Sequence, residues 1–254
     1  MMRVMVTGHL GYIGAVLVPE LLREGYDVVG LDSDFYAGCD FGQPLMRVPT
    51  RIKDVRDVTV DDLQGVDAVL HLAALSNDPL SDLDAERTYD INHRASVRLA
   101  DCARQARVSR FVFSSSCSNY GAGGTGLLDE HAPFNPVTAY GISKTLVERD
   151  VAMLASDDFS PTFLRNATAY GVSPRIRFDL VLNNLVAWAV ATGEIRMKSD
   201  GSVWRPIVHI RDIAAAFIAV LKAPREDIHN EAFNIGRSDQ NYRVREIAEI
   251  VGGG

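Results

Sequence analysis

Residues 7–14 read Thr-Gly-His-Leu-Gly-Tyr-Ile-Gly and follow directly on the apolar stretch Val4-Met5-Val6. Glycines spaced three apart between a strand and a helix let the backbone approach a pyrophosphate, and the free N–H groups at the start of the helix face the anion. We expect Gly8 to form the tight turn, Gly11 to leave room for a phosphate, and Gly14 to let the helix lie close to the sheet. This stretch therefore predicts a dinucleotide-binding fold.

A second strand supports this interpretation. The helix predicted over residues 12–23 closes at Gly25, and the apolar strand over residues 27–31 ends at Asp32. Asp32 lies 18 positions after Gly14, close to the spacing at which a carboxylate accepts hydrogen bonds from the adenosine ribose. A 2′-phosphate there would meet a like charge, so we expect NAD rather than NADP as the cofactor.

Composition excludes several classes of protein. The 254 residues, 47% hydrophobic and 23% charged, predict one main globular domain with a small appended lobe. A net charge of −7 without a block of Lys or Arg argues against nucleic acid as a partner. The longest purely apolar run, residues 213–221, is too short for a membrane span, and the N-terminus resembles no signal peptide, so we expect a cytoplasmic protein. Three irregularly spaced cysteines predict reduced thiols and no metal site.

Strands and helices alternate along the first two thirds of the chain. A third strand is expected to end at Asp54, followed by a buried strand at 66–72, a helix at 85–106 and a strand at 111–113. This alternation predicts an α/β fold, a doubly wound parallel sheet of the Rossmann type with ligands at the carboxyl ends of its strands.

The pattern changes near Arg165. We expect a dinucleotide-binding Rossmann domain over residues 1–165 and a smaller substrate-binding lobe over residues 166–254, interleaved with the last Rossmann elements. The predicted elements of this region are helices at 180–191, 212–221 and 244–251 and strands around Ile207 and at 232–235. Little sequence follows the last helix, so we expect the lobe to be incomplete and the chain to be truncated.

Tyr140 and Lys144 lie four positions apart at the start of a helix predicted to reach Ala155, and they therefore share one helical face. A tyrosine with the ordinary pKa of about 10 is protonated at pH 7, so its use as a base needs a pKa lowered by roughly three units. The positive charges of Lys144 and of an oxidised nicotinamide favour the phenolate. The Lys144 ammonium can also donate hydrogen bonds to the nicotinamide ribose.

The strand at 111–113 runs into Ser114-Ser115-Ser116-Cys117-Ser118-Asn119-Tyr120-Gly121. One of these hydroxyls is expected to hydrogen-bond the reacting sugar oxygen, although serines at a strand end also suit turns and caps. We expect His71 and His209 to be structural and Cys117 to be a small half-buried side chain without thiol chemistry.

These motifs together resemble the extended short-chain dehydrogenase/reductase family, in its NAD-dependent nucleotide-sugar epimerase/dehydratase branch. The resemblance covers nearly the whole chain. It rests on residues 7–14, Asp32, Asp54-Val55, His71-Leu72-Ala73-Ala74, residues 114–121, Tyr140 with Lys144, and residues 205–212.

The resemblance implies three sets of site residues. The catalytic set is Ser116, Tyr140 and Lys144, where Ser116 matches the family Ser/Thr because it stands four positions before Tyr120. The cofactor-binding set is Gly8, Gly11, Tyr12, Ile13, Gly14, Asp32, Asp54, Val55, Leu72, Ala73, Ala74, Asn92, Tyr140 and Lys144. The substrate-binding set is Ser116, Thr168, Asn184, Leu185 and Arg205.

The chain also departs from the family. Family dehydratases carry Asp-Glu directly after the catalytic residue and family decarboxylases carry a Glu two positions after it, whereas this chain has Cys117 and Ser118. Without an acid at these positions, dehydration and decarboxylation lose a proton donor or base. Thr168 stands where many members have Asn, Pro206 replaces a frequent Asp, and a C-terminal stretch with a second diphosphate-binding Arg is missing.

We therefore expect NAD-dependent epimerisation of a nucleotide-diphosphate sugar at C4, through a transient 4-keto sugar. A nucleotide-sugar 4-ketoreductase or dehydrogenase and a non-catalytic dinucleotide-binding sensor or scaffold are the alternatives. The family also implies a homodimer joined through a four-helix bundle, formed by the helices around 95–106 and 146–154.

Overall fold

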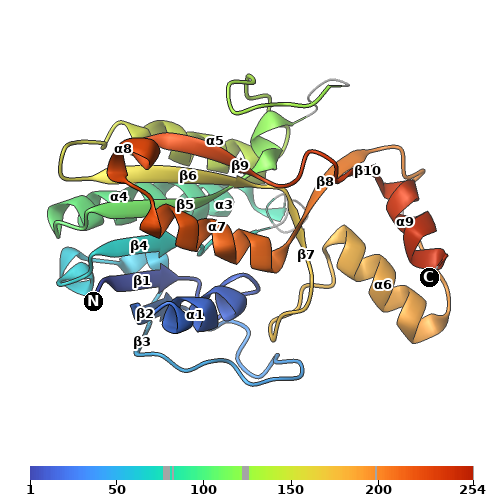
Figure 1. Cartoon of the computed structure of the whole chain (residues 1–254), viewed down its shortest axis with the longest axis horizontal. Coiled ribbons are helices and arrows are strands. Elements are labelled where there is room, and N and C mark those ends of the chain that lie inside the picture. The colour runs from blue at the N-terminus through green and yellow to red at the C-terminus, as the bar shows by residue number, and fades with distance from the viewer. Residues whose placement is uncertain (77–80, 82, 122–125, 198, 254) are drawn as a thin grey trace.

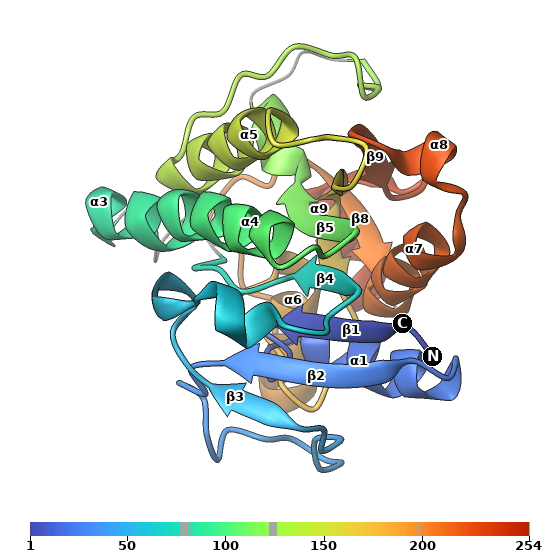
Figure 2. The ribbon, with the colours of Figure 1, turned by 90° about the vertical axis from the view of Figure 1, so that its left-hand side faces the viewer.

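The computed structural model describes residues 1–76, 81, 83–121, 126–197 and 199–253. Among these residues, seven parallel strands form the main sheet in the order β3-β2-β1-β4-β5-β6-β9, as Figures 1 and 2 show. The strands are β1 (Arg3–Thr7), β2 (Asp27–Asp32), β3 (Thr50–Ile52), β4 (Ala68–His71), β5 (Arg110–Ser116), β6 (Ser160–Asn166) and β9 (Glu231–Ile235). The predicted doubly wound parallel sheet is confirmed.

Helices cover both faces of this sheet because alternate strand residues point to opposite sides. Met5 of β1 belongs to the core under α4 (Ala95–Gln105) and α5 (Ala139–Ala152), which also holds Phe111 and Phe113. Val4 and Val6 belong to the opposite core, under α1 (Gly14–Arg23) and α7 (Ile210–Lys222).

Predicted boundaries near the start of the chain were wrong at two places. The first helix begins at Gly14 rather than Tyr12, because Tyr12 and Ile13 still belong to the glycine turn. The third strand ends at Ile52, two residues before Asp54, and Asp54 instead caps the 3₁₀ helix η1 (Val55–Asp57). A short 3₁₀ helix η2 (Val60–Leu63) then leads to β4.

The helix predicted over residues 85–106 is continuous but not uniform. It begins as α3 (Ala85–Thr88), widens into the π-helical turn η3 (Tyr89–Arg94) and continues as α4. Single π turns of this kind often occur at functional sites. This one carries Asn92, a predicted site residue.

A second layer stands beside the sheet. It contains a three-stranded sheet in the order β10-β8-β7, made of β7 (Thr168–Tyr170), β8 (Trp204–His209) and β10 (Asn241–Arg243), with α6 (Val181–Thr192) and α9 (Val244–Gly252) packed on it. Its core is Leu185, Ile207, Ile247 and Ala248.

The chain after residue 166 serves both layers. The helix α7 and the strand β9 return to the main sheet, where β9 pairs with β6, and the short helix α8 (Arg225–Ile228) joins them. The domain division at residue 165 and the interleaving expected with it stay predictions.

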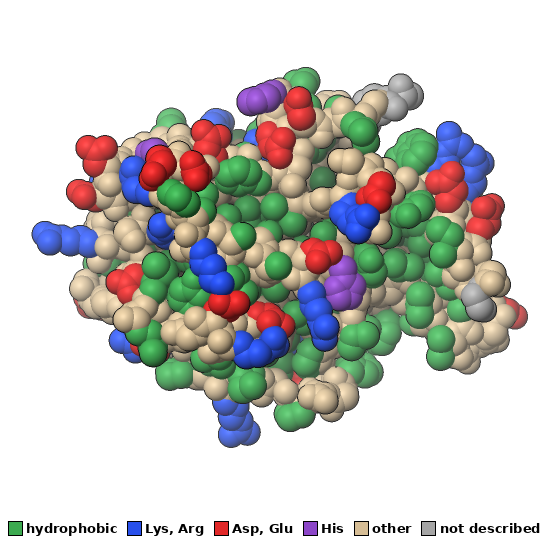
Figure 3. Space-filling model, viewed as in Figure 1, with side chains coloured by type: hydrophobic (Ala, Val, Ile, Leu, Met, Phe, Trp, Pro, Cys, Tyr) green, Lys and Arg blue, Asp and Glu red, His purple; other side chains and the backbone are tan. Residues whose placement is uncertain are grey.

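The surface has no basic region on the face seen in Figure 3, where acidic and basic side chains are interspersed. Among the described helices, none combines the length and apolar character that a membrane span needs.

Candidate active site

The carboxyl ends of the parallel strands open into a cavity of about 1880 Å³ that both layers line. Pockets for one small ligand measure roughly 300–1,000 Å³, so this cavity has room for a dinucleotide and a second ligand. Every predicted site residue lines it except Asn92.

The glycine turn fits a pyrophosphate. Gly8 has a left-handed φ of +71°, and a Cβ there would lie 2.7 Å from the Ala73 backbone nitrogen. A Cβ on Gly14 would lie 2.5 Å from the Gly8 carbonyl oxygen. The glycines thus allow a backbone cradle at the N-terminus of α1 that side chains would fill, and Gly14 serves contact within the turn rather than the predicted approach of helix to sheet.

Asp32 ends β2 at the edge of this cradle. One of its carboxylate oxygens accepts from the Leu10 backbone N–H at 3.0 Å and the other from the Asp34 N–H at 2.9 Å. Two backbone donors therefore fix the carboxylate at the position where a ribose is expected.

Asp54 and Val55 line the cavity farther along the same side. Asp54 caps η1 by accepting from the Arg56 N–H, and the hydrogen bond from the Arg56 side chain holds the pKa of this carboxyl below its usual range. Val55 is buried. Their contact with adenine stays a prediction.

Asn92 lies outside the cavity lining and is hydrogen-bonded to the turn after β4. Its side-chain oxygen accepts from the Leu75 N–H at 2.8 Å and its amide donates to the Leu75 carbonyl at 2.9 Å. These two bonds hold the turn after β4, which presents Leu72, Ala73 and Ala74 to the cavity. Asn92 is therefore placed to shape the cofactor site without lining it.

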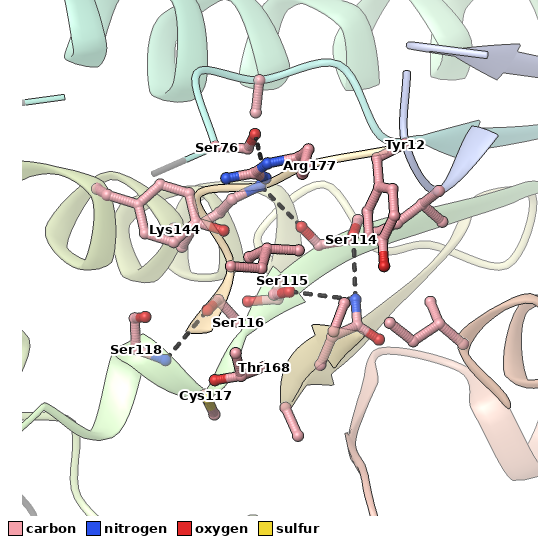
Figure 4. Close-up of a pocket in the computed structure, with 18 of the residues that line it drawn as sticks. Tyr12, Ser76, Ser114, Ser115, Ser116, Cys117, Ser118, Lys144, Thr168 and Arg177 are labelled. Carbon is pink, nitrogen blue, oxygen red and sulfur yellow. Dashed lines mark hydrogen bonds between the residues drawn. The ribbon is translucent and has the colours of Figure 1, made fainter. Parts of the chain in front are cut away.

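The three predicted catalytic residues come from two neighbouring elements. Ser116 is the last residue of β5, while Tyr140 and Lys144 lie on the first turns of α5. A Cβ on Gly141 would lie 2.9 Å from the Ser118 carbonyl oxygen, so this glycine lets the start of α5 approach η4 (Cys117–Tyr120). Figure 4 shows Ser116 and Lys144 among the residues that line this pocket.

Lys144 is almost fully buried. Its ammonium donates to the Ser114 carbonyl at 2.8 Å and lies 5.7 Å from the centre of the Tyr140 ring. Burial lowers the pKa of Lys144 to about 7, against the opposing effect of Glu148. The lysine therefore holds or releases a proton near neutral pH, next to the tyrosine.

Ser116 has a defined hydrogen-bond direction. Its Oγ accepts from the Ser118 backbone N–H at 3.1 Å, as the dashed line in Figure 4 marks. Because the oxygen is used as an acceptor there, its own O–H remains for a ligand oxygen.

The predicted substrate residues lie on the second layer. Thr168 belongs to β7, Arg205 to β8, and Asn184 and Leu185 to α6. The Asn184 side chain donates to the Phe178 carbonyl at 2.7 Å, and its backbone N–H is bonded to Leu180. Leu185 is buried in the core of the second layer, so of this pair only Asn184 has a polar side chain for a diphosphate.

A buried ion pair that no sequence pattern predicts lies beneath the site. Arg165 of β6 donates to the Glu148 carboxylate of α5 at 2.8 Å, and both side chains are over nine-tenths buried. Arg165 also donates to the Tyr120 hydroxyl at 2.9 Å, and Glu148 accepts from Ser115. This network fixes the end of β5 against α5, and so the position of Ser116 relative to Tyr140.

Arg175 and Arg177 were also missed, although both line the cavity. Two arginines two positions apart in a loop of Ser, Pro and Gly were a usable signal for an anion or carboxylate contact. Their partners lie far away in sequence, which no local pattern reveals.

The structural role expected for the histidines agrees with their contacts. His71 Nδ1 lies 2.6 Å from the Thr7 hydroxyl and its Nε2 lies 2.7 Å from the Ser96 hydroxyl, and burial lowers its pKa to about 3. His209 accepts from the Arg211 N–H and caps α7. Cys39, Cys102 and Cys117 are not joined in disulfides, Cys117 is half-buried at the cavity wall, and the described residues hold no metal-ligand cluster.

The fold and the site define an NAD-binding protein of the extended short-chain dehydrogenase/reductase class. Residues 4–236 match the NAD dependent epimerase/dehydratase family, and the chain belongs to that family. NAD is its cofactor, and the glycine cradle and Asp32 fit it.

Relatives and solved structures extend over most of this chain. A UDP-glucose 4-epimerase of Corynebacterium glutamicum is 30% identical over 98% of this chain and 79% of its own length. The structure of MoeE5 in complex with UDP-glucuronic acid and NAD is 30% identical, with a TM-score of 0.86 over 99% of this chain and 81% of that chain. TunA, an NAD-dependent NDP-hexosamine 5,6-dehydratase, is 26% identical, with a TM-score of 0.88 over 100% of this chain and 81% of its own.

Proposed function

We propose that the protein is a cytoplasmic NAD-dependent nucleotide-sugar 4-epimerase. The observation that carries the proposal is the convergence of Ser116, Tyr140 and Lys144 on a cavity that also holds the dinucleotide cradle. The UDP-glucose 4-epimerase relative supports it. Cys117 and Ser118, where family dehydratases have acids, favour epimerisation over dehydration.

The residues of the site divide the work on the C4 oxygen. Tyr140 takes the proton from the C4 hydroxyl and later returns it, Lys144 stabilises the phenolate, and the Ser116 O–H hydrogen-bonds the same oxygen. When bound, NAD supplies the hydride acceptor and donor. The 4-keto sugar must rotate in the site so that hydride returns to the opposite face of its C4 carbonyl. This rotation needs the large cavity.

The second layer would hold the nucleotide diphosphate. Arg205 is exposed at the cavity and brings a positive charge, while Asn184 and Thr168 supply hydrogen-bonding groups. These roles place the sugar between the second layer and the catalytic residues.

The test is an NMR analysis of sugars after incubation with UDP-, dTDP-, GDP- and CDP-hexoses, without cofactor beyond that retained from purification. We expect conversion of one of them to its C4 epimer. Tyr140→Phe should retain NAD and lose at least 99% of the rate, since the proton acceptor is gone. Tyr26→Phe, a tyrosine outside the cavity lining, is the matched control and should keep the rate.

Other outcomes would contradict the proposal in distinct ways. Turnover that consumes added NADH mole for mole would identify a ketoreductase. Loss of water from the sugar would identify a dehydratase, and no turnover with any nucleotide sugar would favour a sensor or scaffold.

A further inference from the structure

Residues 171–178, here called the bridge segment, connect the second layer to the loops that surround the cofactor site. The Tyr12 hydroxyl, in the glycine turn, donates to the Gly171 carbonyl at 2.8 Å, and the Ser173 hydroxyl donates to the Tyr12 carbonyl at 2.9 Å. Arg177 donates to the Ser76 hydroxyl after β4 at 2.8 Å, as Figure 4 shows. The bridge segment is thus fixed to the loops that follow β1 and β4.

The bridge segment contacts the loop after β2 through an ion pair, a backbone hydrogen bond and an aromatic contact. Arg175 is only 7% exposed, and its Nε lies 2.6 Å from an Asp40 carboxylate oxygen. The Phe41 N–H donates to the Pro174 carbonyl at 2.8 Å, and the Phe41 and Phe178 rings meet edge to face with centres 5.6 Å apart. Three kinds of contact therefore close this loop on the bridge segment.

Arg175 also acts, through Asp34, on Asp32, the residue expected to bind the ribose. The second partner of Arg175, at 3.5 Å, is the carboxylate of Asp34. Asp34 has a left-handed φ of +49°, which costs energy for a residue other than glycine and needs support from its surroundings. In this conformation the Asp34 N–H donates to Asp32 at 2.9 Å, so Arg175 helps to orient the Asp32 carboxylate.

The two joined segments line one cavity. Asp34 and Phe41 of the loop after β2, Arg175 and Phe178 of the bridge segment, and the glycine turn all border it. The contacts between the two segments therefore border the cavity in which a dinucleotide on that turn would lie.

We propose that the bridge segment is a lid that retains NAD, and that Arg175 is the positioning residue that holds it closed on Asp34 and Asp40. The inference deepens the proposed function, because an epimerase regenerates its cofactor in each turnover and gains nothing from releasing it. It depends only on NAD binding, so it is tested without any sugar.

The experiment measures the dissociation rate of NADH, by the loss of its bound fluorescence when excess NAD is added. We expect Arg175→Met to raise this rate at least tenfold, because Asp34 and Asp40 lose their shared counter-charge. Asp40→Asn removes the other partner of the ion pair and should also raise the NADH dissociation rate. The Asp40 side chain is 40% exposed, so this variant is expected to fold. The double variant should be no faster than the faster single variant, because both changes break one interaction.

Arg104→Met is the matched control, because Arg104 pairs with Asp101 on the surface of α4 and lines no part of the cavity. Its rate should equal that of the unmodified protein. Unchanged dissociation in both Arg175→Met and Asp40→Asn would overturn the lid, and fully additive effects would overturn the direct pair. If the unmodified protein turns over no nucleotide sugar while Arg175→Met and Asp40→Asn release NADH faster as expected, the proposed function fails and the lid stands.

Discussion

Lys144 shows how burial alone changes the chemistry of a side chain. Its pKa of about 7 lies below the ordinary value of 10.5, because the ammonium is removed from water. The residue can therefore exchange a proton in the pH range where the enzyme is expected to work, which an exposed lysine cannot do.

This shift predicts a pH dependence of stability. The unfolded chain binds the Lys144 proton more tightly than the folded protein between pH 7 and about 10.5, so folding becomes more favourable as pH rises through this window. Relative to Lys144→Met, the unmodified NAD-free protein should gain a few kcal/mol from pH 7 to pH 10 in urea unfolding. His71 stays neutral there and adds nothing.

The exposed Lys222 provides the control for this measurement. Its pKa is raised by a hydrogen bond to Glu24, so the sign of its small effect is opposite. Lys222→Met should show no comparable rise of the difference with pH. A flat difference for Lys144→Met as well would mean that the buried lysine titrates normally.

Gly8 permits a second test at one residue. A Cβ there would meet the Ala73 nitrogen at 2.7 Å, so Gly8→Ala should open the turn and weaken NADH binding at least tenfold in a fluorescence titration. Gly193 has the same φ of +71° with nothing within 4 Å of its Cβ position. Gly193→Ala therefore carries only the backbone strain of about 1–2 kcal/mol and should bind NADH normally. Equal binding by both variants would contradict the close approach of the two loops.

At the scale of elements, α9 is held to the second layer by very few side chains. Ile247 is 2% exposed and packs with Leu185 and Ile207, whereas Ile250 on the same helix is 62% exposed. A small core of this kind should be sensitive to the loss of a single side chain.

Truncation of these two isoleucines should therefore have different effects. Ile247→Ala should lower the free energy of unfolding by about 2–5 kcal/mol, because it leaves a cavity in the second layer. Ile250→Ala should change it by less than about 0.5 kcal/mol. Urea unfolding of both variants measures the difference, and similar values would mean that α9 adds no packing energy.

The element η3 explains why Asn92 reaches the site. In a regular α-helix over residues 85–106, the side chains from the π turn onward would point in other directions around the helix axis. With the π turn at Tyr89–Arg94, the Asn92 side chain reaches Leu75. The sequence pattern predicts a helix there but contains no signal for the wider turn.

At the scale of the whole molecule, α4 and α5 lie side by side on one flank, as Figure 2 shows. Ile142 and Leu146 of α5 are partly buried. Met153, at the end of α5 and two helical turns after Leu146, is 73% exposed. These are the helices from which the family resemblance implies a homodimer.

Light scattering should therefore give about twice the chain mass of 27.8 kDa. Leu146→Arg should convert the dimer to a monomer, because a charge at a buried apolar contact costs several kcal/mol. Leu22→Arg, on α1 at the other face of the sheet, should leave the mass unchanged. A monomer mass for the unmodified protein would refute the dimer.

The sequence by itself determined the features that depend on local spacing. The glycine turn at 7–14, the position of Asp32 and the Tyr140–Lys144 pair follow from strand and helix periods, so the dinucleotide fold and the placement of Tyr140 and Lys144 at the cavity could be predicted. Helix starts and strand ends, as at Gly14 and Ile52, were missed by about two residues because capping and turn geometry decide them.

Only the tertiary structure decided which distant residues meet. Arg175 reaches Asp40 across 135 positions, Arg165 joins Glu148 between two elements, and β9 returns to β6 after the whole second layer. Such contacts depend on how the layers pack, and burial then sets their strength and the pKa of Lys144. No local pattern contains that information, because the partners share neither a helical face nor a strand.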